Sequence, residues 1–330
     1  MKINKSTIKK ILVISLSNIG DIVLTLPVID ILRHDFSDAK VSVVIGAKGE
    51  PLLKGNPIFE NIYIYIKRQP LKDLFAWMGK LRRENFDLVV DLRNTAIPFF
   101  VAPRYRTSLF LKRDHSKHMR FQHLNRLRSV YPFEQVSPRR YSVFMSLDDK
   151  KYMDQIIERE VGETGRLVVF SPGAADQRKR WNQEGFATVA DRLISDYGAK
   201  VVFVDSEKKN VEYIMGKMKH PAVDLSGRAN LTQVAYLLTR AQLILTNDSG
   251  LMHLSSYLDA PVVAVFGHTN PKEYGPWGSD SFFVKKQTDA AKERDPQFDH
   301  MVRISPDDVI AEVLRKTNWV KGVPKDTNCV

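Results

Sequence analysis

The chain alternates between short apolar runs and longer segments in which apolar residues recur every three or four positions. The short runs predict buried strands, at 11–16, 40–45, 61–66, 88–92, 167–170, 200–205, 243–245 and 262–266. Helical periodicity fills the intervals, at 22–33, 72–84, 148–160, 232–239 and 306–316, with a shorter helix at 250–257. Strands that alternate with helices favour parallel sheets with helices on both faces, so the predicted fold class is α/β.

The strands fall into two series, separated by a charged helical segment and a hinge-like Gly-Glu-Thr-Gly at 162–165. A chain of 330 residues is long enough for two domains, each with its own core. We therefore predict one domain at 1–155 and a second at 156–330.

Polar residues gather where three of the predicted strands end, at 17–21, 171–174 and 247–250. Ligands of parallel sheets bind at the carboxyl ends of the strands, so these loops are the candidate sites. A helix that begins after Asp248 would direct free backbone N–H groups at a phosphate. The small residues at 171–174 would let the backbone approach a phosphate closely, and Lys179 and Arg180 would neutralise its charge.

Each of these loops also has a purely structural interpretation. Asp21 can cap its helix, and Asn247, Asp248 and Ser249 can do the same for the helix that follows them. The segment around Lys179 can be a basic loop with a buried Trp181. The 17–21 loop also lacks the glycine spacing of dinucleotide folds and the lysine of a P-loop. Residue spacing alone therefore leaves both the structural and the ligand-binding interpretation of these loops open.

The net charge of +12 points to an anionic partner. The most basic segment, 102–128, contains a single acid, Asp114, among eight cationic residues: Arg104, Arg106, Lys112, Arg113, Lys117, Arg120, Arg126 and Arg128. We interpret it as a docking surface for an anionic acceptor or membrane, with a solvated loop and helix as the alternative. Nucleic-acid signatures are absent, so no nucleic-acid partner is expected.

The composition also bears on where the protein resides. No apolar run is long enough to span a membrane, and the apolar run at the N-terminus is interrupted by Asn18, Gly20 and Asp21. The one cysteine, Cys329, excludes a disulfide framework within the chain. We expect a cytoplasmic protein that contacts the inner face of the inner membrane peripherally.

Three motifs, in order, resemble those of the lipopolysaccharide heptosyltransferases, glycosyltransferase family 9. The first is Ser-x-x-Gly-Asp at 17–21, followed by Leu-x-Leu-Pro at 24–27. The second is Pro-Gly-Ala at 172–174 with Lys-Arg-Trp at 179–181. The third is Asp-Ser-Gly-Leu-Met-His at 248–253, followed by a strand that ends in Phe-Gly-x-Thr-Asn-Pro at 266–271.

The resemblance implies the GT-B architecture, two Rossmann-like domains with parallel sheets that face each other across a cleft. In this fold class the closing helix can pack back on the first domain, and 306–316 is the candidate. The implied reaction moves a heptose from ADP-heptose to the inner core of lipopolysaccharide with inversion at the anomeric carbon. A metal ion or other cofactor is not expected.

The resemblance also assigns roles to residues. Asp21 would be the general base, with Ser17 and Gly20 near the acceptor and the basic segment, including Arg104, Arg106, Lys112, Arg113 and Arg120, docking it. Lys179 would contact the donor diphosphate, with Arg180 as a weaker partner, and Glu207 would hold the nucleoside. The remaining predicted donor-binding residues are Ser171, Gly173, Ala174, Asp248, Ser249, Gly250 and His253.

One feature departs from the family pattern, because many relatives carry cysteines in the final segment and 287–303 has none. This leaves the subfamily open. Two other functions also stay open: a transferase of the same fold with another nucleotide sugar or acceptor, and a non-catalytic relative that binds a nucleotide or a membrane.

Overall fold

The computed structural model describes residues 3–109, 114–135, 139–162, 165–287 and 299–321. The chain divides into two compact units, unit 1 (Met1–Phe144) and unit 2 (Met145–Val330). The division therefore precedes the predicted boundary at 155/156. The reason is that helix α6 (Leu147–Ile156) packs against α9 (Leu231–Arg240) of unit 2. Part of the predicted hinge, 163–164, lies outside the described residues.

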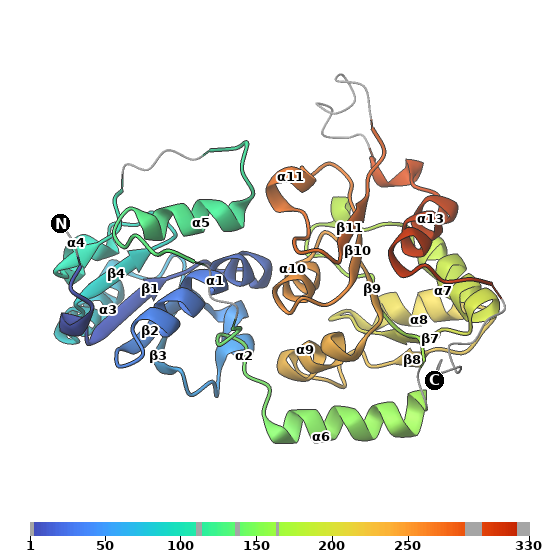
Figure 1. Ribbon diagram of the computed structural model, residues 1–330, viewed down its shortest axis with the longest axis horizontal. Helices are drawn as coiled ribbons and strands as arrows, with labels where there is room; N and C mark the ends of the chain where they lie inside the picture. The colour runs from blue at the N-terminus through green and yellow to red at the C-terminus, as the bar shows by residue number, and fades with distance from the viewer. Residues whose placement is uncertain (1–2, 110–113, 136–138, 163–164, 288–298, 322–330) are drawn as a thin grey trace. The chain divides into compact units, whose positions relative to one another are not determined.

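Unit 1 is built on a five-stranded sheet in the order β3-β2-β1-β4-β5 (Figure 1). The strands are all parallel, and they are β1 (Lys10–Ile14), β2 (Lys40–Gly46), β3 (Phe59–Tyr65), β4 (Leu88–Asp91) and β5 (Tyr105–Arg106). The first four coincide with predicted strands. The fifth, β5, was not predicted, because two residues inside a basic segment carry no periodicity.

Helices cover both faces of this sheet. They are α1 (Ile19–Asp35), α2 (Glu50–Leu53), α3 (Leu71–Arg83), α4 (Ile97–Val101) and α5 (Met119–Arg128). Helix α1 is buried over most of its length, because it lies between the sheet and α5. On the other face, α3 and α4 pack on Leu12, Ile14, Val44 and Val89 of the sheet.

Unit 2 contains a six-stranded parallel sheet in the order β11-β10-β9-β6-β7-β8. Its strands are β6 (Leu167–Ser171), β7 (Lys200–Phe203), β8 (Val223–Asp224), β9 (Leu243–Asn247), β10 (Val262–Val265) and β11 (Ser281–Val284). Strands β8 and β11 were not predicted. The four central strands match predicted apolar runs, and their side chains are almost entirely buried.

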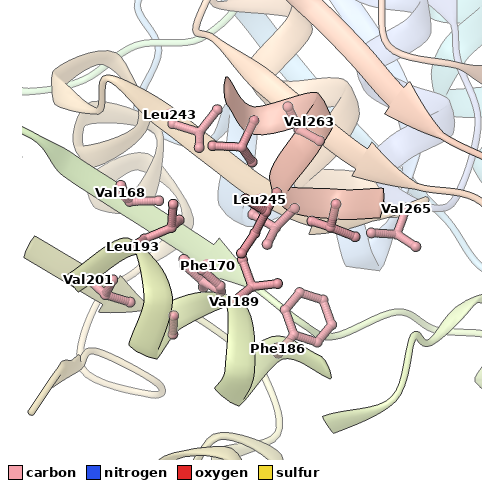
Figure 2. Packing of buried hydrophobic residues seen from close by; sticks show 14 of the residues in the cluster. Val168, Phe170, Phe186, Val189, Leu193, Val201, Leu243, Leu245, Val263 and Val265 are labelled. Carbon is pink, nitrogen blue, oxygen red and sulfur yellow. The ribbon is translucent and has the colours of Figure 1, made fainter. Parts of the chain in front are cut away.

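The core of unit 2 lies between this sheet and its helices. Figure 2 shows Phe170 of β6 and Leu245 of β9 against Phe186 and Leu193 of α7 (Gln183–Tyr197). Besides α6 and α9, the other helices in the described part of unit 2 are α8 (Lys208–Lys217), α10 (Gly250–Tyr257), α11 (Pro271–Tyr274) and α13 (Pro306–Thr317). The closing helix α13 is part of unit 2. Its apolar face, with Val309 and Val313 buried, packs on α7 and β11 within unit 2.

Each sheet contains one point where the strand order reverses. In unit 1 the chain leaves β1 toward β2 and later returns to β4 on the other side of β1. In unit 2 the chain leaves β6 toward β7 and later returns to β9 on the other side of β6. The loops that leave the carboxyl ends of the two strands at such a point diverge, and they leave room for a ligand between them. The predicted site loops at 17–21, 171–174 and 247–250 all lie at these two points.

Candidate functional site

Asn247 links the two loops at the reversal point of unit 2. It is fully buried at the end of β9, and its Nδ2 donates to the carbonyl oxygen of Pro172 at 2.6 Å while its Oδ1 accepts from the backbone N–H of Trp181 at 3.1 Å. Asn247 is therefore a bridge and does not cap α10. Trp181 is also buried, with Nε1 donating to the carbonyl oxygen of Ile304 at 2.9 Å, so the structural interpretation of this tryptophan is confirmed.

Lys179 and Asp248 form an ion pair across the same reversal point. Lys179 Nζ lies 2.7 Å from Asp248 Oδ2, and the hydroxyl of Thr269 donates to that oxygen at 2.7 Å. The carboxylate side chain is 2% exposed, whereas the lysine keeps 27% of its surface in contact with solvent. Two residues predicted to contact the donor are thus brought together, and Asp248 is committed to Lys179 rather than to capping a helix.

A short helical turn, Gln177–Lys179, presents the lysine. Asp176 caps this turn by accepting from the backbone N–H of Arg178 at 3.0 Å, and it also pairs with the Arg178 guanidinium at 2.7 Å. These hydrogen bonds lower the pKa of Asp176 to about 2, so the cap stays ionised at neutral pH. The turn is therefore held in one conformation while Lys179 projects from its end.

Ser249 is the N-cap of α10, and its hydroxyl accepts from the backbone N–H of Met252 at 3.5 Å. Of the three predicted capping candidates, Ser249 is the one that acts as a cap. Gly250 begins the helix, so the first-turn N–H groups emerge beside Asp248. His253 lies one turn further along, buried, with its ring stacked on Trp277 at a centroid distance of 5.8 Å.

Arg180 and Glu207 close the other side of this loop. The Arg180 guanidinium forms two hydrogen bonds to Glu207, at 2.8 and 2.5 Å, and its Nε donates to the carbonyl oxygen of Ala174 at 2.7 Å. The guanidinium lowers the pKa of the Glu207 carboxyl through its hydrogen bonds and its charge. Both residues were predicted to bind the donor, and in this structure each holds the other against the 171–174 loop.

Gly173 is required by the packing of that loop. A Cβ built there would lie 2.8 Å from Cγ of Asp205, too close for a side chain. Asp205 is fixed beneath the loop, because its carboxylate accepts from the Glu207 backbone N–H at 3.0 Å and from the side chain of Asn210 at 2.7 Å. The glycine thus brings the backbone down onto Asp205, which follows β7. Ser171, at the other end of the loop, is the last residue of β6.

At the reversal point of unit 1, Asp21 lies in the first turn of α1. The N-cap position is Asn18, whose side-chain amide donates to Asp21 Oδ2 at 3.1 Å. Asp21 therefore does not cap the helix. Its carboxylate is half-buried next to the positive end of the helix dipole. Gly20 precedes it within the helix, and Ser17 precedes the cap.

Sequence reasoning missed the loop that faces Ser17. Asp91, buried at the end of β4, accepts from the backbone N–H groups of Arg93 at 2.9 Å and Thr95 at 2.5 Å. Burial raises the pKa of Asp91, although these hydrogen bonds oppose the rise. The wrapped loop places the Arg93 guanidinium 3.2 Å from Ser17 Oγ and 4.6 Å above the ring of Tyr65. The signal was a polar run after a buried strand, but the sequence does not show that β4 lies beside β1.

The described part of the basic segment is divided between two elements. Arg104 and Arg106 lie before and on the edge strand β5, and the Arg106 guanidinium stacks on Phe99 at 4.1 Å. Arg120 lies in the first turn of α5, over the ring of Phe121 at 4.8 Å. Lys112 and Arg113 lie outside the described residues. The described part of the segment thus contains a short strand and a helix, and its role as a docking surface stays a prediction.

The described residues contain no group of three or more His, Cys, Asp or Glu side chains placed to hold a metal ion. Within the same part of the chain, every helix is too short or too polar to cross a membrane.

Residues 75–300 match the sequence profile described as glycosyltransferase family 9 (heptosyltransferase). The chain belongs to this family. It is therefore a glycosyltransferase, and the resemblance drawn from the three motifs is confirmed.

The family 9 chain is similar to curated proteins over most of its length. It is 23% identical over 313 residues to the lipopolysaccharide core heptosyltransferase OpsX of Haemophilus influenzae. The aligned region covers 86% of this chain and 87% of OpsX. It is 24% identical over 284 residues to lipopolysaccharide heptosyltransferase 3 of Escherichia coli K12. That alignment covers 78% of this chain and 82% of the E. coli protein.

Solved structures share its fold. The glycosyltransferase family 9 protein of Veillonella parvula superposes with a TM-score of 0.80 at 22% identity, over 96% of this chain and 99% of that one. ADP-heptose lipopolysaccharide heptosyltransferase II of E. coli superposes with a TM-score of 0.75 at 22% identity, over 94% of this chain and 98% of the E. coli chain. The predicted class, two α/β units with parallel sheets of the GT-B type, is confirmed.

Proposed function

We propose that this family 9 enzyme transfers a heptose from ADP-heptose to the inner core of lipopolysaccharide, with inversion at the anomeric carbon. The observation that supports it most is the Lys179–Asp248 pair at the start of α10. It lies inside the family match, and it joins a cation and a helix N-terminus at one point of the sheet. That combination suits the diphosphate of a nucleotide sugar. Unit 2 would bind the donor and unit 1 the acceptor.

The proposed reaction is a single displacement. The acceptor hydroxyl oxygen forms a bond to the anomeric carbon as the bond from that carbon to the β-phosphate oxygen breaks. The hydroxyl proton passes to Asp21, and ADP leaves with the bonding electron pair. A carboxylate positioned beside the acceptor hydroxyl can accept its proton, a contribution of roughly 10²–10⁴-fold in rate.

Charge develops on the departing ADP, and protein groups would neutralise it without a metal ion. Lys179 keeps its exposed surface while Asp248 holds it, so its remaining N–H donors can reach a phosphate. The N–H groups at the start of α10 add a second source of positive potential. The 171–174 loop, with Gly173 against Asp205, would let the backbone approach the same phosphates.

The acceptor would be anionic, in keeping with the net charge of +12 and the arginines of the basic segment. Arg104, Arg106 and Arg120 are the described members that we assign to acceptor docking. The guanidinium groups of Arg104 and Arg106 stack on aromatic rings, which leaves their edges able to bind phosphate. Peripheral contact with an anionic leaflet would concentrate the enzyme at its acceptor.

The test compares Asp21→Asn with Asp73→Asn, a matched control because Asp73 occupies the same third position in α3 as Asp21 does in α1. Purified enzyme is assayed for ADP release with ADP-heptose and a panel of other nucleotide sugars, and ADP affinity is measured by calorimetry. Asp21→Asn should lose turnover by about 10²–10⁴-fold with unchanged ADP affinity, and Asp73→Asn should retain both.

Equal losses of turnover and ADP affinity in Asp21→Asn would make Asp21 a structural residue and refute its role as base. ADP release with a different nucleotide sugar would replace the proposed donor. Binding of nucleotides without release from any donor would favour the non-catalytic alternative.

A further inference from the structure

Unit 1 contains a pocket of about 260 Å³ at the carboxyl end of its sheet. The floor is formed by the ends of three neighbouring strands, through Ile14, Val44 and Tyr65. The walls are Met78 and its neighbours on α3 and Ile97 at the start of α4. The pocket lies on the sheet face covered by α3 and α4, and no role is yet assigned to it.

The lining of the pocket is apolar apart from Arg93, Thr95 and the hydroxyl of Tyr65. A sugar or a nucleotide that entered it would lose hydrogen bonds to water and find few replacements. An aliphatic chain would lose none, and it would gain from leaving water. The lining therefore selects an apolar group as the occupant.

Two phenylalanines at the rim are unusually exposed. Phe75 of α3 is 56% exposed and Phe100 of α4 is 43% exposed, and both line the pocket. Their rings meet edge to face at a centroid distance of 6.2 Å. The Arg82 guanidinium donates to the carbonyl oxygen of Phe100 at 3.0 Å and so helps to fix the rim. Neighbouring exposed aromatic side chains are typical of a surface that binds an apolar ligand.

Arg93 supplies the one full charge in the lining. It stacks on Tyr65, which is also in the lining, and donates to Ser17 Oγ at 3.2 Å. No carboxylate of the described residues lies within ion-pair distance of its guanidinium. An arginine in this state can take an anionic group, since its planar fork matches a phosphate or carboxylate. Ser17 belongs to the loop that leads to Asp21, so the anion would lie beside the proposed reaction centre.

We propose that this pocket binds an anionic lipid, with an aliphatic chain between α3, α4 and the sheet and the anionic group on Arg93. The lipid can come from two sources: the acceptor itself, or a phospholipid of the leaflet that carries it. The chemistry of binding is the same in both cases. Only the assignment to the acceptor rests on the proposed function.

The first experiment measures binding without turnover, so it does not depend on the proposed reaction. The probe is dodecyl phosphate, titrated below its critical micelle concentration by calorimetry, with dodecyl maltoside as the uncharged chain. Ala96→Phe should block the pocket, since Ala96 lines it from an exposed position; Ala76→Phe, exposed on α3 and outside the lining, is its control. Arg93→Gln removes the charge, with the exposed Arg83→Gln as control.

Dodecyl phosphate should bind the wild type at least tenfold more tightly than it binds Ala96→Phe or Arg93→Gln, with both controls within twofold of wild type. Dodecyl maltoside should be weakened by Ala96→Phe and not by Arg93→Gln. The absence of dodecyl phosphate binding, or equal binding by all five proteins, would overturn the proposal.

The second experiment separates the two sources. ADP release is measured with an acylated acceptor and with the same acceptor after removal of its acyl chains. A loss of at least tenfold in kcat/KM on deacylation, abolished in Ala96→Phe, would assign the pocket to the acceptor. Equal rates with the two acceptors, together with dodecyl phosphate binding, would assign it to a leaflet lipid. No ADP release with either acceptor would refute the proposed function and leave the binding result standing.

Discussion

Replacement of Lys179 by methionine would separate the two roles that the lysine has in unit 2. Its Nζ lies 2.7 Å from a carboxylate oxygen of Asp248, which is almost fully buried. Methionine has a similar length and no charge, so it removes the ion pair with little change in packing. The variant should therefore reveal both a structural cost and a loss of affinity for ADP.

The structural cost can be worked from the geometry of the pair. Two unit charges at 2.7 Å attract by about 6 kcal/mol at an effective dielectric constant of 20. Desolvation of the two ions offsets much of this, so the intact pair contributes little net stability. Removal of one partner from a buried pair costs about 3–5 kcal/mol, because the other charge stays buried and unpaired. Two factors reduce this cost for Asp248 to about 2 kcal/mol: water can reach it from the side of Lys179, and the Thr269 hydroxyl still donates a hydrogen bond to it.

A loss of that size is measurable by calorimetric unfolding. For domains of about 150–250 residues each kcal/mol shifts Tm by about 2–4 °C, so Lys179→Met should lower the Tm of unit 2 by about 4–8 °C. Asp248→Asn should cost less, because the lysine it releases can reach solvent. The double variant Lys179→Met, Asp248→Asn should be more stable than Lys179→Met alone, because it no longer buries an unpaired charge.

ADP binding tests the second role. A charge-assisted hydrogen bond contributes about 1.5–3 kcal/mol, so the dissociation constant of ADP should rise about 10–100-fold in Lys179→Met. The double variant should recover Tm and not affinity. If Lys179→Met left both Tm and ADP affinity unchanged, the pair would be a surface contact without consequence. If the double variant recovered both, the lysine would serve only to neutralise Asp248.

Two further predictions concern the surroundings of this site. Gly173→Ala should lower the free energy of unfolding by about 1–3 kcal/mol and weaken ADP binding, because its Cβ would press on Asp205; Gly216→Ala, in open space on α8, should instead be neutral or stabilising in the same calorimetric assay. The Arg228 guanidinium holds the pKa of Glu160 at about 2, below the ordinary value of 4.5 for a glutamate, so this pair stabilises the fold above pH 4.5 and its contribution is lost as pH falls toward 2. Glu160→Gln should therefore lower Tm at pH 7 by an amount that shrinks through this window, and a constant difference from pH 7 to pH 2 would contradict the assignment.

The sequence predicted the elements that carry their own periodicity. Buried runs such as 88–92 and 262–266 became β4 and β10, because continuous apolar residues must be buried whatever surrounds them. The two-residue strands β5 and β8 could not be predicted, because their pairing depends on a neighbouring strand already in place. The same limit explains why α6 was divided from unit 2: its contact with α9 is tertiary.

Site prediction met a related limit. The loops themselves could be found, because polar residues after a buried strand mark its carboxyl end. Which loops lie side by side depends on strand order, so the bond between Arg93 and Ser17 could not be foreseen. Arg180 and Glu207 were predicted separately as donor-binding residues, and nothing in their spacing indicated that they form hydrogen bonds with each other. Their roles in donor binding stay predictions.

A buried carboxylate at the start of α10 looks unfavourable for a site that is to bind a diphosphate. Asp248 adds negative charge where the ligand would bring more. Its position explains why it can still serve the site: Thr269 and Lys179 share its Oδ2, and they keep the charge compensated while Lys179 remains partly exposed. A lysine on a free loop would lose rotamer entropy when it met the phosphates, whereas one already held by Asp248 and by the capped turn at Gln177–Lys179 has lost it in advance. Asp248 therefore makes the site less positive, but it also holds Lys179 in position for the phosphates. Replacement of Asp248 by asparagine should weaken ADP binding for this reason, even though it removes a negative charge from a site that binds an anion.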